Sequence, residues 1–164
     1  TRLRCDWSSD VCSSDLYVVG KENIDAVKFF EDSNQVNPMG GIVLTNNIKN
    51  DVVTVFKKMI TLDKFCVENK LQPELIKVDV EGAEIDLLWG GCQMIKDSRP
   101  IIFLSLHPKH IEQLGQSLES LTEFLQVVNY HCLTYEGREN SDFSVNECIL
   151  SHLQNPPDRV YLKA

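Results

Sequence analysis

Four side chains that can hold a negative charge or exchange a proton follow two apolar runs of the sequence. Asp79, Glu81 and Glu84 come after the run LIKV, and His107 comes after the run IIFLSL. Asp79, Glu81 or His107 can act as a general base when it lies within hydrogen-bond reach of a hydroxyl group. Carboxylates placed like those of Asp79 and Glu81 can also bind a divalent cation. These residue types therefore indicate either proton removal from an acceptor or cation binding.

Three of these side chains also have structural alternatives. Glu81 and Glu84 are expected in the first turn of a helix, where the helix dipole stabilises negative charge. His107 can serve as a base, as a donor to a substrate or as a satisfied polar group at a strand end. It forms a His-x-x-His pair with a second histidine, but two histidines alone do not define a metal site, and no metal ligand is predicted. Structural roles are predicted for the remaining histidines, His110, His131 and His152, and for the aromatic residues Trp89 and Tyr130.

The elements that must position these residues are a strand and a helix within LIKVDVEGAEIDLLW, Leu75 to Trp89. The run at 75–78 is too short for a helix and contains β-branched residues, so it predicts a strand buried on both faces, as in a parallel sheet. The side chains that follow recur at a helical period and predict a helix ending near Asp97: Ile85, Leu88, Cys92 and Ile95. The carboxylates then lie at a strand's carboxyl end, where open α/β sheets bind ligands.

The second apolar run, at 101–104, predicts another buried strand, and the two strands with their helix predict a right-handed βαβ unit. Pro108 opens the next helix, whose apolar positions are Ile111, Leu114, Leu118, Leu121 and Leu125. Residues 127–134 and 145–150 predict an antiparallel hairpin around a turn at 136–141. Upstream, strands are expected at 16–19, 42–44 and 51–60, helical turns at 23–30 and a loop at 31–41. Thr61 or Asp63 is expected to cap a helix that runs to Lys70.

The run IKVDVEGAEIDLLWGG, preceded by ITLDKF and followed by RPIIFLSLHP, resembles the FkbM family of S-adenosylmethionine-dependent methyltransferases. The resemblance covers about Val52 to Leu150 and implies an α/β fold with a Rossmann-like class I methyltransferase sheet, mostly parallel, with a C-terminal antiparallel hairpin. It implies methyl transfer from S-adenosylmethionine to an oxygen of a small-molecule or saccharide acceptor. Asp79, Glu81 and His107 are the expected catalytic residues, and Asp79 and Val80 the expected cofactor contacts.

Three segments are expected: a non-native or disordered tail at 1–16, a partial methyltransferase domain at 17–154 and a C-terminal tail at 155–164. In the first, Ser8-Ser9-Asp10 recurs as Ser13-Ser14-Asp15, and RCDWSSDVCSSDL resembles a translated sequencing adaptor. The family's Gly-rich cofactor loop has no counterpart in the sequence, so the domain is expected to be truncated at its amino-terminal end.

Composition limits the remaining possibilities. The chain has 164 residues and a net charge of -8, which argues against a surface for nucleic-acid phosphates. No apolar stretch approaches the ~20 residues of a membrane span. The six cysteines include no Cys-x-x-Cys pair, so reduced thiols and a cytoplasmic location are expected.

Two other functions remain open from the sequence. In a metal-dependent nucleotide-sugar glycosyltransferase, Asp79-Val80-Glu81 would be the acidic metal-binding pair, and activity would depend on Mn²⁺ or Mg²⁺. A truncated, non-catalytic α/β domain would bury its sheet but bind no cofactor. Titration with S-adenosylhomocysteine separates this last case from a methyltransferase.

Overall fold

The computed structural model describes residues 17–32, 40–41 and 52–153, and within them the chain forms two four-stranded sheets and five helices. The first sheet has the order β1-β4-β2-β3, with β1 at Val18–Gly20, β2 at Ile24–Asp32, β3 at Gly40–Gly41 and β4 at Val52–Thr61. The second has the order β5-β6-β8-β7, with β5 at Leu75–Val78, β6 at Ile101–Ser105, β7 at His131–Leu133 and β8 at Glu147–Ser151. The helices are α1 (Leu62–Asn69), α2 (Glu84–Gly90), α3 (Cys92–Ser98), α4 (Pro108–Gln113) and α5 (Leu118–Val128).

The second sheet carries the predicted βαβ unit and hairpin. β5 and β6 pair in parallel with Val78 opposite Leu104, while β6–β8 and β8–β7 are antiparallel. In the first sheet β1–β4 is parallel and the β2 ladders are antiparallel. The sequence predicted a mostly parallel sheet; the described ladders are two parallel and four antiparallel. The α/β class and the antiparallel C-terminal hairpin are confirmed.

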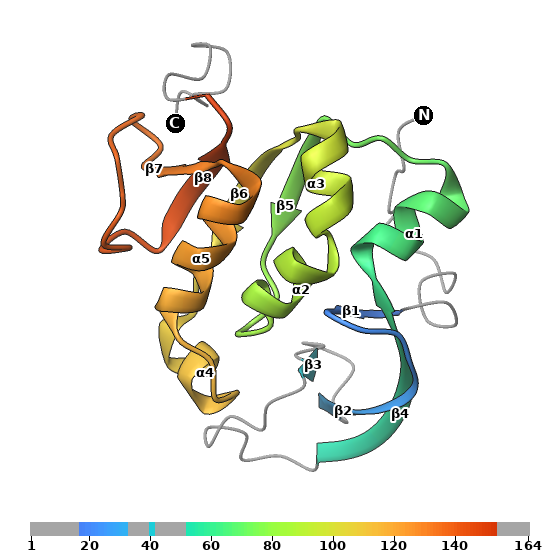
Figure 1. Ribbon diagram of the computed structural model, residues 1–164. Coiled ribbons are helices and arrows are strands. Elements are labelled where there is room, and N and C mark those ends of the chain that lie inside the picture. The colour runs from blue at the N-terminus through green and yellow to red at the C-terminus, as the bar shows by residue number, and fades with distance from the viewer. Residues whose placement is uncertain (1–16, 33–39, 42–51, 154–164) are drawn as a thin grey trace, which may run out of the picture.

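Helices α2, α3 and α5 lie on one side of the second sheet (Figure 1). Their apolar side chains enclose the core with the inward side chains of β6 and β8; the most completely buried of these include Ile95, Ile102, Leu104, Leu121, Phe124 and Leu150. No helix in the described ranges is both long and apolar enough to cross a membrane.

The prediction that the strand at 75–78 is buried on both faces is wrong. Leu75 is 58% exposed, whereas Val78 is 1% exposed and faces the core. The reason is position: β5 lies at the edge of its sheet in the described part of the chain, and the helices cover one face there. An apolar run alone does not distinguish an edge strand from a central one.

Several predicted element boundaries also need correction. Residues 24–32 form β2 instead of helical turns, because they pair along β4. The helix expected from Ile111 to Leu125 is two helices, since Gly115 adopts φ +74 and Ser117 is the N-cap residue before α5. The helix after the acidic turn is likewise divided, at Gly91. The strand expected at 127–134 is confined to β7 because α5 continues to Val128.

The strands near 16–19 and 51–60 and the helix ending at Lys70 are confirmed. Thr61 caps α1 by accepting a hydrogen bond from the Lys64 N–H at 3.2 Å. Asp63 caps a different helix: its carboxylate accepts from the backbone N–H groups of Gln93 and Met94, at the start of α3. The strand expected at 42–44, most of the loop at 31–41, and Cys5 and Cys12 lie outside the described residues. The other four cysteines are free thiols, as predicted.

The first sheet meets helix α2 at a backbone contact. β1 lies beside α2, and a Cβ atom built on Gly90 would fall 2.0 Å from the carbonyl oxygen of Gly20. Only a residue without a side chain allows this approach.

Candidate functional site

The acidic turn after β5 places two carboxylates at the carboxyl end of this strand. Asp79 follows the last residue of the strand and Glu81 lies in the turn, with side chains 41% and 47% exposed. Glu81 has φ 52 and Gly82 has φ 110, so the chain turns sharply before α2 begins at Glu84. Glu81 therefore lies before the helix, and the prediction that it belongs to the first helical turn is wrong.

Glu84 is the first residue of α2, yet its side chain is fully buried, with 0% exposed. Its Oε1 accepts a hydrogen bond from the Gly82 N–H at 3.0 Å and lies 2.7 Å from Nδ1 of His107. The predicted helix-end position is confirmed. The contact with His107 was not predicted, because it depends on how the ends of β5 and β6 align.

His107 stands two residues after β6 and immediately before α4. With Nδ1 donating to Glu84, its Nε2 lies 3.6 Å from Glu81 Oε2 and 4.0 Å from Asp79 Oδ1. Burial alone would lower the pKa of His107, but the Glu84 hydrogen bond and the charges of Glu81, Glu84 and Asp79 outweigh it and raise that pKa. The structure thus brings all three predicted catalytic residues together.

His110, to which the sequence assigned a structural role, also lies here. Its ring stacks on that of His107, with centroids 5.8 Å apart, and its Nδ1 is 3.2 Å from Glu81 Oε2. The spacing of the His-x-x-His pair on one helical turn was the signal for this neighbourhood. Gly82 packs directly against it, because a Cβ there would lie 2.6 Å from His110 Cβ. We call Asp79, Glu81, Glu84, His107 and His110 the carboxylate–histidine cluster.

The other candidates have mainly structural contacts. Val80 is partly buried and packs against the core. The Trp89 ring meets that of Phe124 edge to face at 5.3 Å, and the Tyr130 hydroxyl donates to the Pro100 carbonyl at 2.8 Å. Packing roles were predicted for both aromatic residues.

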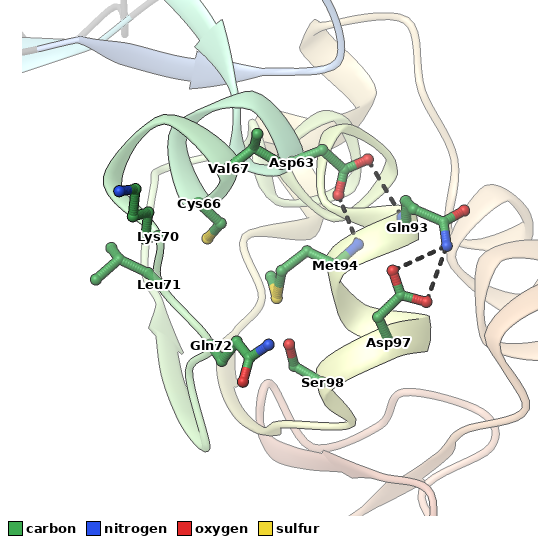
Figure 2. A pocket seen from close by; sticks show the side chains of 10 residues that line it. All are labelled: Asp63, Cys66, Val67, Lys70, Leu71, Gln72, Gln93, Met94, Asp97 and Ser98. Atoms are coloured by element: carbon green, nitrogen blue, oxygen red, sulfur yellow. Dashed lines mark hydrogen bonds between the residues drawn. The ribbon is translucent and has the colours of Figure 1, made fainter.

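Two cavities of the described residues could hold a ligand. One of about 320 Å³ adjoins the cluster and is lined by Leu106, His107, Pro108, Lys109, His110 and Asn146. The other, of about 400 Å³, lies between α1 and α3 (Figure 2), and none of its lining residues belongs to the cluster. There the carboxylate of Asp63 accepts hydrogen bonds from the backbone N–H groups of Gln93 and Met94. The carboxylate of Asp97 accepts hydrogen bonds from the Gln93 side chain. The smaller cavity is therefore the better candidate for chemistry.

The mixed α/β fold, in which β5 and β6 pair in parallel and helices cover the sheet, is compatible with a class I methyltransferase-like domain. A family model described as "Methyltransferase FkbM domain" matches residues 2–132, and the chain belongs to this family. The match extends further toward the amino terminus than the Val52–Leu150 range that carried the resemblance. Comparisons with curated proteins and with solved structures gave no match.

Proposed function

We propose that the chain uses S-adenosylmethionine to methylate an oxygen of a small-molecule or saccharide acceptor. The observation that carries the proposal is the Glu84–His107 contact, which directs the other ring nitrogen of His107 toward Asp79 and Glu81. A base fixed in one orientation beside carboxylates, at the carboxyl end of the sheet, suits proton removal from an acceptor hydroxyl.

The residues present fit a positively charged cofactor. S-adenosylmethionine supplies a methyl group on a sulfonium, and three carboxylates converge on the cluster. Asp79 is the best placed of the two exposed carboxylates to hold the sulfonium or orient the acceptor, because it stands directly at the end of β5. His107 accepts the hydroxyl proton at Nε2, and Glu84 stabilises the resulting imidazolium through Nδ1–H.

The surroundings of the cluster support a small polar acceptor. The adjoining cavity of about 320 Å³ combines an apolar wall with the polar side chains of Lys109 and Asn146. The net charge of -8 makes nucleic acid a poor acceptor. The free thiols of the described residues support a cytoplasmic location. The family match favours methyl transfer over the nucleotide-sugar glycosyltransferase alternative.

The test begins with calorimetric titration of the chain with S-adenosylhomocysteine, for which binding is expected. Steady-state methyl transfer is then measured across pH for Asp79→Asn and His107→Gln, with Glu68→Gln on α1 as a control, because Glu68 pairs with Lys64 and belongs neither to the cluster nor to the adjoining cavity. We expect Asp79→Asn to lower turnover or cofactor affinity. His107→Gln should lower turnover about 100-fold if it is the base. Absence of S-adenosylhomocysteine binding, or unchanged kinetics in both variants, would refute the proposal.

A further inference from the structure

We propose that Asp79, Glu81 and His107 bind a divalent cation of the Mn²⁺ type. One oxygen or nitrogen from each side chain lies within 4.8 Å of the others. The distances from His107 Nε2 to Glu81 Oε2 and Asp79 Oδ1 are 3.6 and 4.0 Å. Ligand atoms that each lie about 2.0 to 2.2 Å from one cation are separated by roughly 3 to 4 Å, so the three groups need little movement to converge on it.

Glu84 gives an independent reason to expect positive charge at this position. Its carboxylate is fully buried, and its Oε2 has no hydrogen-bond partner, while Oε1 holds His107. A buried carboxylate is costly unless a positive charge lies close by. Histidines that ligate metals almost always donate their other N–H to a carboxylate or carbonyl in the same way. Glu84 thus fits the role of a residue that positions the ligand without touching the cation.

The nitrogen that faces the carboxylates is free to act as a ligand. Because Nδ1 donates to Glu84, neutral His107 presents a lone pair at Nε2, toward two negative groups that repel it. A cation removes this repulsion by binding all three. The same atom cannot accept a proton while a cation occupies it, so cation and proton compete for Nε2.

The set of ligands indicates the kind of cation. Two carboxylate oxygens and one imidazole suit Mn²⁺ better than Ca²⁺, which prefers ligands that are all oxygen. Three protein ligands leave coordination positions for water or for a small oxygen-bearing molecule, and the cavity lined by His107 and His110 adjoins them. The proposal concerns binding by the chain alone, and it goes beyond the proposed function and does not depend on it.

Lys77 provides a variant that should improve binding. Its Nζ lies 3.1 Å from Asp79 Oδ2 and competes with a cation for that carboxylate. Removing an exposed ion pair of this kind by Lys77→Met is expected to tighten Mn²⁺ binding about two- to five-fold. A gain of affinity cannot result from a damaged fold.

The experiment titrates the 164-residue chain with MnCl₂ and follows free Mn²⁺ by electron paramagnetic resonance, so it needs neither cofactor nor acceptor. Wild type should bind one ion, and Glu81→Gln and His107→Gln should each weaken binding by more than about 10-fold. Glu84→Gln should also weaken it about 10-fold, although Glu84 is not a ligand. His131→Gln is the matched control, because its imidazole lies 3.9 Å from the Glu139 carboxylate away from the cluster and should have no effect.

Two outcomes would overturn the proposal. One is that wild type shows no binding up to about 1 mM Mn²⁺, the weak end of protein sites for divalent cations. The other is that Glu81→Gln binds like wild type. This variant decides the matter even if His107→Gln fails to fold, because the Glu81 side chain is 47% exposed and its replacement leaves the core intact.

Discussion

Tyr130 shows how burial of a single hydroxyl links stability to pH. The residue is 6% exposed, its hydroxyl donates to the Pro100 carbonyl, and burial raises its pKa to about 12 against the opposing charge of Arg99. Because the folded pKa exceeds the unfolded value of about 10, the stabilisation is complete below pH ~10 and is lost as pH rises toward ~12.

We expect Tyr130→Phe to remove this pH dependence and to cost about 1 to 2 kcal/mol at neutral pH, because the Pro100 carbonyl loses its buried partner. Urea unfolding of both proteins at neutral pH and between pH 10 and 12 measures the effect. Equal slopes of stability against pH in this range for the two proteins would contradict it.

At the level of residues, the sequence predicted which side chains lie close together but not the contacts between them. Asp79, Glu81 and His107 were identified because they follow predicted strands whose carboxyl ends meet. The Glu84–His107 contact requires β5 and β6 to align with Val78 opposite Leu104, and no local pattern reports that alignment. His110 was assigned a structural role because a His-x-x-His pair alone does not define a metal site.

Among the elements, α3 depends on a cap supplied by another helix. Asp63 of α1 accepts from the N–H groups of Gln93 and Met94 at 3.2 and 2.7 Å. Asp63→Ala is therefore expected to lower the free energy of unfolding by about 0.5 to 2 kcal/mol, the usual loss for a capping residue. Asp63→Asn, which keeps an acceptor oxygen, should lose less. Urea denaturation tests this, and equal stability of wild type and Asp63→Ala would exclude the capping role.

The turn before α2 is held against α4 by Gly82. Gly82→Ala must place a methyl group 2.6 Å from His110 Cβ and 2.9 Å from its backbone carbon, at φ +110. Gly115→Ala is the matched control, because φ is also positive, at +74, but no atom lies within 4 Å of the added carbon. We expect Gly115→Ala to cost about 1 kcal/mol, and Gly82→Ala to exceed it by about 1 to 3 kcal/mol.

Thermal or urea unfolding of the two variants measures that difference directly. If both lose the same stability, backbone strain alone accounts for Gly82 and its contact with α4 contributes nothing.

Sequence patterns predicted the type of most elements better than their ends. The apolar runs predicted β5, β6 and β8, because each run is too short for a helix and too apolar for an exposed loop. The period across residues 111–125 continues through Gly115, so it could not reveal that α4 and α5 are separate. The residues of β2 gave no clear strand signal because pairing with the long β4 determines their conformation.

At the scale of the whole molecule, the two sheets differ in how well they are covered. β6 and β8 lie inside the core, whereas Val53 and Phe56 of β4 are 48% and 65% exposed. Backbone amide hydrogens exchange most slowly where apolar burial is greatest, because local opening there costs the most free energy. We expect hydrogen exchange measured by mass spectrometry to be slowest in β6 and β8 and distinctly faster in β2 and β4. Equal protection of β4 and β6 would show that both sheets unfold together.

The contact between β1 and α2 has a consequence for how the protein can vary. Gly90 of α2 rests on the backbone of Gly20, so main-chain atoms set how closely β1 approaches the helix. Main-chain atoms are the same in every protein sequence. Substitutions at other positions therefore leave the atoms of this contact unchanged, whereas any side chain at position 90 would force β1 away from α2.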